Sequence, residues 1–157
     1  MRAARLPLET ARYRLAFLWF PMCGIFFLLM VLQTLLGAFG DRANEAWGWA
    51  LPNFLPTLAL MVSVFAATAL QDSVRSVTVV HSSFFKLSFG LSAFYIIILF
   101  LILIVPAFRG VFDDIPPTPS ERLRNMELSN LFLGPLQSLV VAALGALFFL
   151  KEDERES

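Results

Sequence analysis

Four long stretches without a charged residue most constrain what this chain can fold into. They lie between charged residues and cover positions 15–40, 46–71, 87–108 and 128–150. A helix that crosses the hydrocarbon core of a bilayer needs about 20 predominantly apolar residues, and each stretch reaches that length. The pattern predicts an all-α membrane protein with four transmembrane helices. We expect these helices at about residues 15–39, 49–70, 86–107 and 129–150.

The remainder of the chain is too short to hold a second domain. Hydrophobic residues make up 58% of the sequence, against about 45–50% in soluble domains. The longest segment between the charge-free stretches, 109–127, is far shorter than the roughly 50 residues that a stable domain requires. We therefore predict a single transmembrane domain over residues 1–157.

The distribution of basic residues predicts the orientation. Lys and Arg concentrate in the cytoplasmic segments of membrane proteins. With the N-terminus inside, the cytoplasmic side carries eight of the 12 Lys and Arg residues. These are Arg2, Arg5, Arg12, Arg14, Arg75, Lys86, Lys151 and Arg155. We expect a multi-pass protein of the bacterial inner (cytoplasmic) membrane with both termini in the cytoplasm.

Aromatic residues near the ends of the spans agree with this orientation. Tyr13 and Trp19 lie near the inner end of the first span, and Trp47 and Trp49 lie at the outer start of the second. Tyr and Trp combine an apolar ring with a polar group, which suits the headgroup layer. We expect all four side chains at the membrane surface.

Prolines and a capping motif suggest where helices begin and end. Pro52 and Pro56 are expected in the first turns of the second helix, where backbone amides lack intrahelical partners. Pro106 is expected to end the third span. The sequence from Thr118 to Glu121 matches a capping box with proline at the first helical position, which predicts a helix start near residue 119. The inner loop, 72–85, fits either a short strand or a continued helix.

The charge-free spans lack the groups that membrane chemistry usually requires. Ionisable side chains at mid-membrane depth typically mark proton relays, ion pathways and voltage sensors, and none is expected here. Cys23 and His81 are the single cysteine and the single histidine, so they complete neither a disulfide nor a metal site. We therefore predict a non-enzymatic protein without catalytic residues, metal or cofactor.

Three polar residues fall at similar depth in the outer half of the spans: Gln33, Asn53 and Gln137. Such side chains commonly form hydrogen bonds between transmembrane helices. A second interpretation is a polar ring that lines the outer vestibule of an oligomeric pore. Both interpretations remain open at the level of sequence.

A stripe of small residues recurs every four positions in the fourth span, and a shorter one occurs in the second. The members are Gly134, Ser138, Ala142 and Ala146, together with Ala59, Ser63 and Ala67. Small residues allow helix backbones to approach closely, which favours association in lipid. The stripe predicts helix packing, either within one chain or between the subunits of a homo-oligomer, with the fourth span as an interior helix.

The chain resembles KwaA, the membrane subunit of the Kiwa anti-phage defence system. The resemblance covers the whole chain and rests on size, four spans, the lack of an appended domain and both termini inside, together with the segment Leu128-Ser-Asn-Leu-Phe-Leu-Gly-Pro-Leu-Gln137. It implies a homo-oligomer of the inner membrane, a cytoplasmic DNA-binding partner and a role in detecting infection at the envelope. The resemblance assigns no functional residue.

These observations predict a membrane sensor or scaffold that self-associates in the lipid bilayer and engages a cytoplasmic protein partner, without binding nucleic acid directly. Anti-phage defence is the favoured setting, by resemblance. The alternatives are an oligomeric pore or channel, and an accessory subunit of a transporter or respiratory complex.

Overall fold

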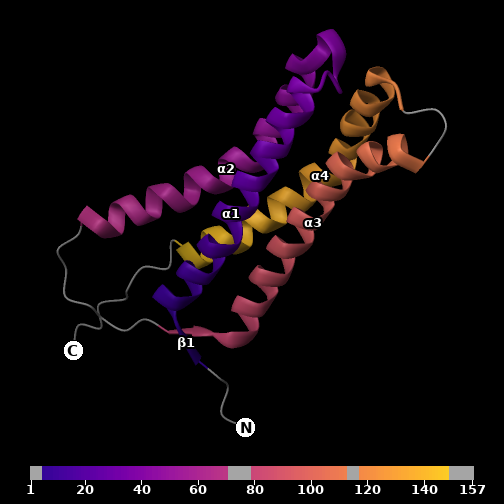
Figure 1. Cartoon of the computed structure of the whole chain (residues 1–157). Helices are drawn as coiled ribbons and strands as arrows, with labels where there is room; N and C mark the ends of the chain where they lie inside the picture. The colour runs from indigo at the N-terminus through magenta and orange to yellow at the C-terminus, as the bar shows by residue number, and fades with distance from the viewer. Residues whose placement is uncertain (1–4, 71–78, 113–116, 149–157) are drawn as a thin grey trace, which may run out of the picture.

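The computed structural model describes residues 5–70, 79–112 and 117–148, with side chains from 6–66, 79–109 and 117–148. Within these residues, four helices are long and apolar enough to cross a membrane, which confirms the predicted number and helical class. Figure 1 shows their arrangement. They are α1 (Leu8–Leu35), α2 (Ala43–Leu70), α3 (Ser82–Phe112) and α4 (Pro119–Phe148).

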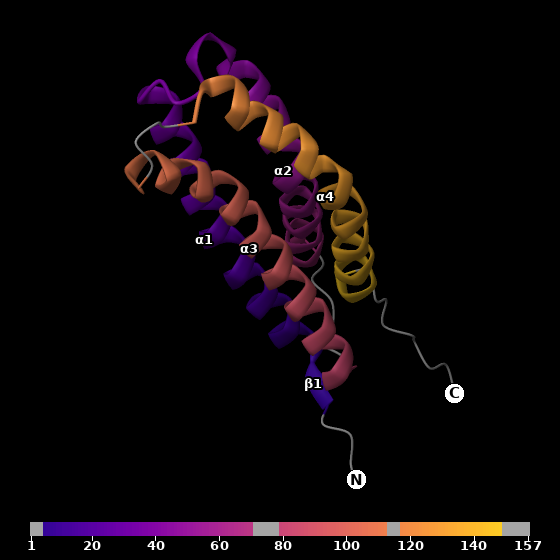
Figure 2. The same cartoon turned by 90° about the vertical axis from the view of Figure 1, so that its right-hand side faces the viewer.

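A short two-stranded pairing joins the start of α1 to the start of α3. Strand β1 (Arg5–Pro7) pairs antiparallel with β2 (Val79–His81), with Leu6 opposite Val80. The described part of the inner loop, 79–85, therefore contains a strand and then the first turn of α3, whereas residues 71–78 lie outside the described part of the chain. This pairing holds the first turns of α1 and α3 at the same end of the bundle (Figures 1 and 2).

The helices extend beyond the charge-free stretches, so their bounds differ from those of the predicted spans. Helix α1 begins at Leu8 rather than at residue 15 and includes both Arg12 and Arg14. The absence of charge marks the part of a helix suited to hydrocarbon, but a helix continues where charged side chains can reach water. At the other end, α1 stops at Leu35 rather than at residue 39.

Glycine sets the end of α1. Gly37 has a φ of 71°, in the left-handed region that glycine adopts without strain. Its amide donates to the carbonyl of Thr34, and the amide of Ala38 donates to that of Gln33, as in a Schellman motif. A short 3-10 helix (Gly40–Arg42) then leads into α2, which lies antiparallel beside α1 as the short connection predicts.

Of the five prolines inside the described helices, three lie there against expectation. Helix α2 begins at Ala43, so Pro52 and Pro56 lie well beyond its first turns, and Pro106 lies inside α3. An interior proline removes one hydrogen bond to the carbonyl four residues earlier and bends the helix without necessarily ending it. Figure 1 shows α2 leaving the direction of the other helices in its C-terminal half.

The capping box at the start of α4 is confirmed. The hydroxyl of Thr118 accepts a hydrogen bond from the backbone amide of Glu121 at 3.3 Å, and the Glu121 carboxylate accepts one from the amide of Thr118 at 2.8 Å. Pro119 is the first residue of the helix. Both bonds satisfy amides at a helix start that have no intrahelical partner.

The core lies between the four helices. Its largest fully buried side chains include Trp19 from α1 and Tyr95 from α3, whose ring centroids are 6.0 Å apart. Trp19 and Trp49, expected at the membrane surface, are buried in the bundle instead. Indole has a large apolar surface, and here that surface packs against neighbouring aromatic rings, with Phe26 beside Trp49.

Candidate assembly face and interhelical polar contacts

The small-residue stripe of α4 faces away from the rest of the chain. Helix α4 contacts each of the other three helices. It does so with large apolar residues that are fully buried: Leu133, Val140, Leu144 and Leu147. The stripe lies on an exposed face of the same helix, and all four of its members are exposed: Gly134, Ser138, Ala142 and Ala146. Packing among the described residues therefore does not account for the stripe.

The shorter stripe of α2 is exposed as well. Ala59 and Ser63 are both exposed, whereas the side chain of Ala67 lies outside the described residues. Both follow Pro52 and Pro56 at helical spacing, which places the four residues on one face of α2. We call the exposed stripes of α4 and α2 together the assembly face.

A groove of about 470 Å³ separates the two halves of the assembly face. It is lined by Pro52 and Pro56 from α2 and by Gln137, Ser138, Val141 and Ala142 from α4. Its lining carries no charged residue. The groove lies beside the bend of α2. Beyond this bend, the C-terminal half of α2 turns away from the other helices (Figure 1).

The backbone of α4 is open along this face. A Cβ atom built on Gly134 would meet no described atom within 4 Å. The hydroxyl of Ser138 donates to the carbonyl of Gly134 at 3.0 Å, and that of Ser63 donates to the carbonyl of Ala59 at 2.7 Å. Each serine thus satisfies its own hydroxyl, and the face offers close backbone approach without a polar group that requires a partner.

The three polar residues proposed to line a vestibule each join a different pair of helices. Gln33 of α1 donates to the carbonyl of Leu103 in α3 at 3.3 Å. Gln137 of α4 donates to the carbonyl of Pro52 in α2 at 2.8 Å. The buried Asn53 of α2 accepts hydrogen bonds from the hydroxyl of Tyr95 in α3, at its backbone oxygen (2.7 Å) and at Oδ1 (3.1 Å). Within the described chain these side chains form separate bridges between helices.

Two tryptophans form further bridges that sequence reasoning missed. Trp49 of α2 donates from Nε1 to the hydroxyl of Ser129 in α4 at 3.0 Å, and both side chains are buried. Trp47 donates to the hydroxyl of Thr34 in α1 at 3.2 Å. The sequence placed these indoles at the surface by residue type, but each needs a hydrogen-bond acceptor when it is buried. A hydroxyl on a neighbouring helix supplies it.

Arg12 binds the C-terminal end of α4, a contact that the sequence did not suggest. Its guanidinium donates to the carbonyls of Leu147 (3.4 Å) and Phe148 (2.7 Å) and lies 5.9 Å from the centre of the Phe148 ring. The last carbonyls of a helix have no intrahelical donor and carry partial negative charge. Arg12 therefore caps α4 and fixes it to α1.

Some buried polar atoms have no partner among the described residues. They are Nε1 of Trp19, Oγ1 of Thr57 and the hydroxyl of Ser92. All three side chains are fully buried, and each comes from a different helix. The interior therefore contains hydrogen-bonded pairs, Asn53–Tyr95 and Trp49–Ser129, beside polar atoms that no described group satisfies.

The described residues contain no group of three His, Cys, Asp or Glu side chains that could hold a metal ion. Comparison with protein-family models, with curated proteins and with solved structures gives no match.

Proposed function

We propose that this protein is a non-enzymatic sensor or scaffold of the bacterial inner membrane. In this proposal it forms a homo-oligomer through the assembly face and engages a cytoplasmic protein partner. Anti-phage defence is the proposed setting, and this rests on the resemblance to KwaA alone. The observation that carries self-association is the exposure of every described member of the small-residue stripes.

Physical reasons favour a protein helix as the occupant of this face. Glycine inside a helix costs about 1 kcal/mol relative to alanine, yet a Cβ atom at Gly134 would meet no described atom of another part of the chain within 4 Å. Small residues gain little from contact with lipid tails but allow a second helix to come close enough for extensive van der Waals contact. The uncharged groove between Pro56 and Ala142 would receive such a helix.

The proposed orientation places a partner at the end of the bundle that holds β1 and β2. Positive charge in the N-terminal segment and at Lys86 favours the cytoplasm for this end. The start of α1, the start of α3 and the end of α4 meet there, through the strand pairing and the Arg12 cap. A partner bound at this end would respond to a change in the relative positions of these three helices.

Substitution on the assembly face tests self-association. Gly134→Leu combined with Ala142→Leu fills the stripe with side chains that the chain itself can accommodate, since Gly134 has open space and Ala142 is exposed. Single-molecule photobleaching in liposomes should show several copies for the wild type and mainly one for the variant. Gly90→Leu on α3 is the matched control, because Gly90 is also exposed with open space around it. A wild type that is monomeric, or a double variant that still assembles, would refute the proposal.

A pore is the second candidate, because Gln137 and Ser138 line the groove at the assembly face. Ion or dye flux from liposomes that contain the oligomer separates the two functions. A scaffold should give no flux above that of empty liposomes. Flux that Gln137→Leu abolishes would favour the pore, whereas flux that this substitution leaves unchanged would exclude Gln137 from a conduit.

Affinity purification followed by mass spectrometry would reveal a cytoplasmic partner, or a larger transporter or respiratory complex.

A further inference from the structure

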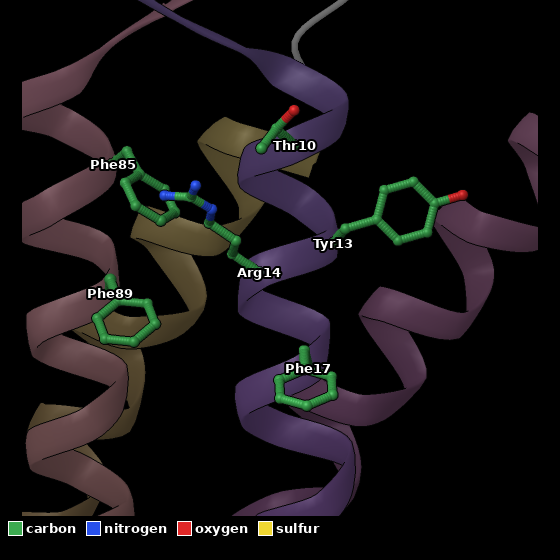
Figure 3. Close-up of a pocket in the computed structure, with 6 residues that line it drawn as sticks. All are labelled: Thr10, Tyr13, Arg14, Phe17, Phe85 and Phe89. Carbon is green, nitrogen blue, oxygen red and sulfur yellow. The ribbon is translucent and has the colours of Figure 1, made fainter.

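A pocket distinct from the assembly face opens between α1 and α3 at the end of the bundle that holds β1 and β2. Its volume is about 730 Å³, and its lining is mostly aromatic. Figure 3 shows the side chains from both helices. The lining residues are Thr10, Tyr13, Arg14 and Phe17 from α1, and Phe85 and Phe89 from α3.

The pocket combines one cation with apolar walls. Arg14 extends from α1 across the pocket toward Phe85 (Figure 3). Its side chain is exposed, and within the described ranges no carboxylate pairs with it. Arg12, two positions earlier in the chain, caps α4 instead. No described carboxylate therefore competes with an external anion for Arg14.

The pocket also lies at the edge of the apolar part of the helices. Arg14 is the last charged residue before the charge-free stretch 15–40, and Lys86 is the last before the stretch 87–108. Phe17 and Phe89 lie within those stretches, and both are exposed, Phe17 by 81%. The lining thus changes from cationic to aromatic in the direction in which a bilayer changes from headgroups to hydrocarbon.

We propose that this pocket binds one anionic phospholipid. Its phosphate contacts the guanidinium of Arg14, with the Thr10 hydroxyl at the same end of the pocket, and one acyl chain lies between Phe17 and Phe89. Arginine forms strong charge-assisted hydrogen bonds with phosphate oxygens, and exposed aromatic rings provide apolar contact for the chain. The proposal requires membrane insertion but is independent of self-association.

Photocrosslinking tests the proposal on the full-length protein. Phosphatidylglycerol with a diazirine on one acyl chain should crosslink mainly to peptides that contain Phe17, Phe85 or Phe89. Unlabelled phosphatidylglycerol should compete, whereas phosphatidylcholine should compete poorly and inorganic phosphate at millimolar concentration should not compete. Crosslinks spread evenly over all four helices would indicate an ordinary lipid layer and would overturn the proposal. Full competition by phosphate alone would overturn the assignment to a lipid.

Charge variants locate the headgroup. A basic residue near an anionic membrane surface contributes about 1 kcal/mol, so Arg14→Gln should weaken retention of phosphatidylglycerol about fivefold in native mass spectrometry. Arg14→Lys should retain most of the binding, which shows that loss in Arg14→Gln is not a folding defect. Lys86→Gln is the matched control at the same end of the bundle, because Lys86 is exposed but does not line the pocket. Equal loss in Lys86→Gln and Arg14→Gln would refute a defined site.

Discussion

The side-chain amide of Gln137 in α4 donates a hydrogen bond of 2.8 Å to the carbonyl oxygen of Pro52 in α2. That carbonyl lies four residues before Pro56, which has no amide hydrogen to donate to it. The proline therefore frees an acceptor inside α2, and Gln137 satisfies it from another helix. Satisfaction of freed carbonyls by neighbouring helices is what permits proline inside transmembrane helices.

The Gln137–Pro52 bond predicts a specific coupling between two positions. Gln137→Leu should lower the free energy of unfolding by about 0.6–2 kcal/mol, because the carbonyl of Pro52 then lacks a donor. Combined with Pro56→Ala, the same substitution should cost less, since the alanine amide can occupy that carbonyl. Chemical unfolding in lipid–detergent micelles, arranged as a double-mutant cycle, measures the coupling.

Additive effects of Gln137→Leu and Pro56→Ala would contradict this account. Ser138→Ala serves as the control, because the Ser138 hydroxyl bonds to a carbonyl of its own helix and is exposed. It should leave the stability of the single subunit nearly unchanged.

Removal of two different buried hydroxyl groups should have different effects on the free energy of unfolding. Tyr95→Phe should lower the free energy of unfolding by about 1 kcal/mol, because the Tyr95 hydroxyl donates to Asn53. Thr57→Val should leave stability unchanged or raise it, since no described group bonds to the Thr57 hydroxyl and valine has a similar shape. Unfolding of both variants under the same conditions gives the comparison, and a clear loss in Thr57→Val would show that its hydroxyl has a partner.

Arg12 and Arg14 should separate stability from lipid binding. Arg12→Gln should reduce stability by up to about 2 kcal/mol, because it removes the charged cap from the end of α4. It should also increase hydrogen exchange in the last described turn of α4. Arg14→Gln should change neither property, since Arg14 makes no such contact within the described residues. Protection of α4 that is equal in Arg12→Gln and in the wild type would refute the cap.

The capping box should contribute to the start of α4. Thr118→Ala removes the acceptor for the Glu121 amide and should cost about 1 kcal/mol. Hydrogen exchange should rise in the first turns of α4, while the end of the helix keeps its protection. Asn125→Ala is a suitable comparison on the same helix, because Asn125 is exposed, and it should cause no loss. Equal exchange in Thr118→Ala and in the wild type would show that the capping box is dispensable.

Patterns that depend on nearby residues were predictable from sequence. The charge-free stretches predicted four helices, and the Thr118–Glu121 motif predicted where α4 begins, because both depend on local composition and spacing. The positions of Pro52 and Pro56 were assigned wrongly, since charge alone did not show that α2 begins at Ala43. Trp19 and Trp49 were placed at the surface by residue type, although the bundle buries both.

The sequence by itself determined that this chain forms four long apolar helices, and it identified small residues repeating along α4. Only the tertiary structure decided which way that repeat faces. Helical spacing defines a face but carries no information about what covers it, because the cover comes from helices distant in the chain. Here the large residues of α4 fill the interior, and the small ones are exposed. For the same reason, only the packing of the helices determines the hydrogen-bond partners of Gln137, Tyr95 and Arg12.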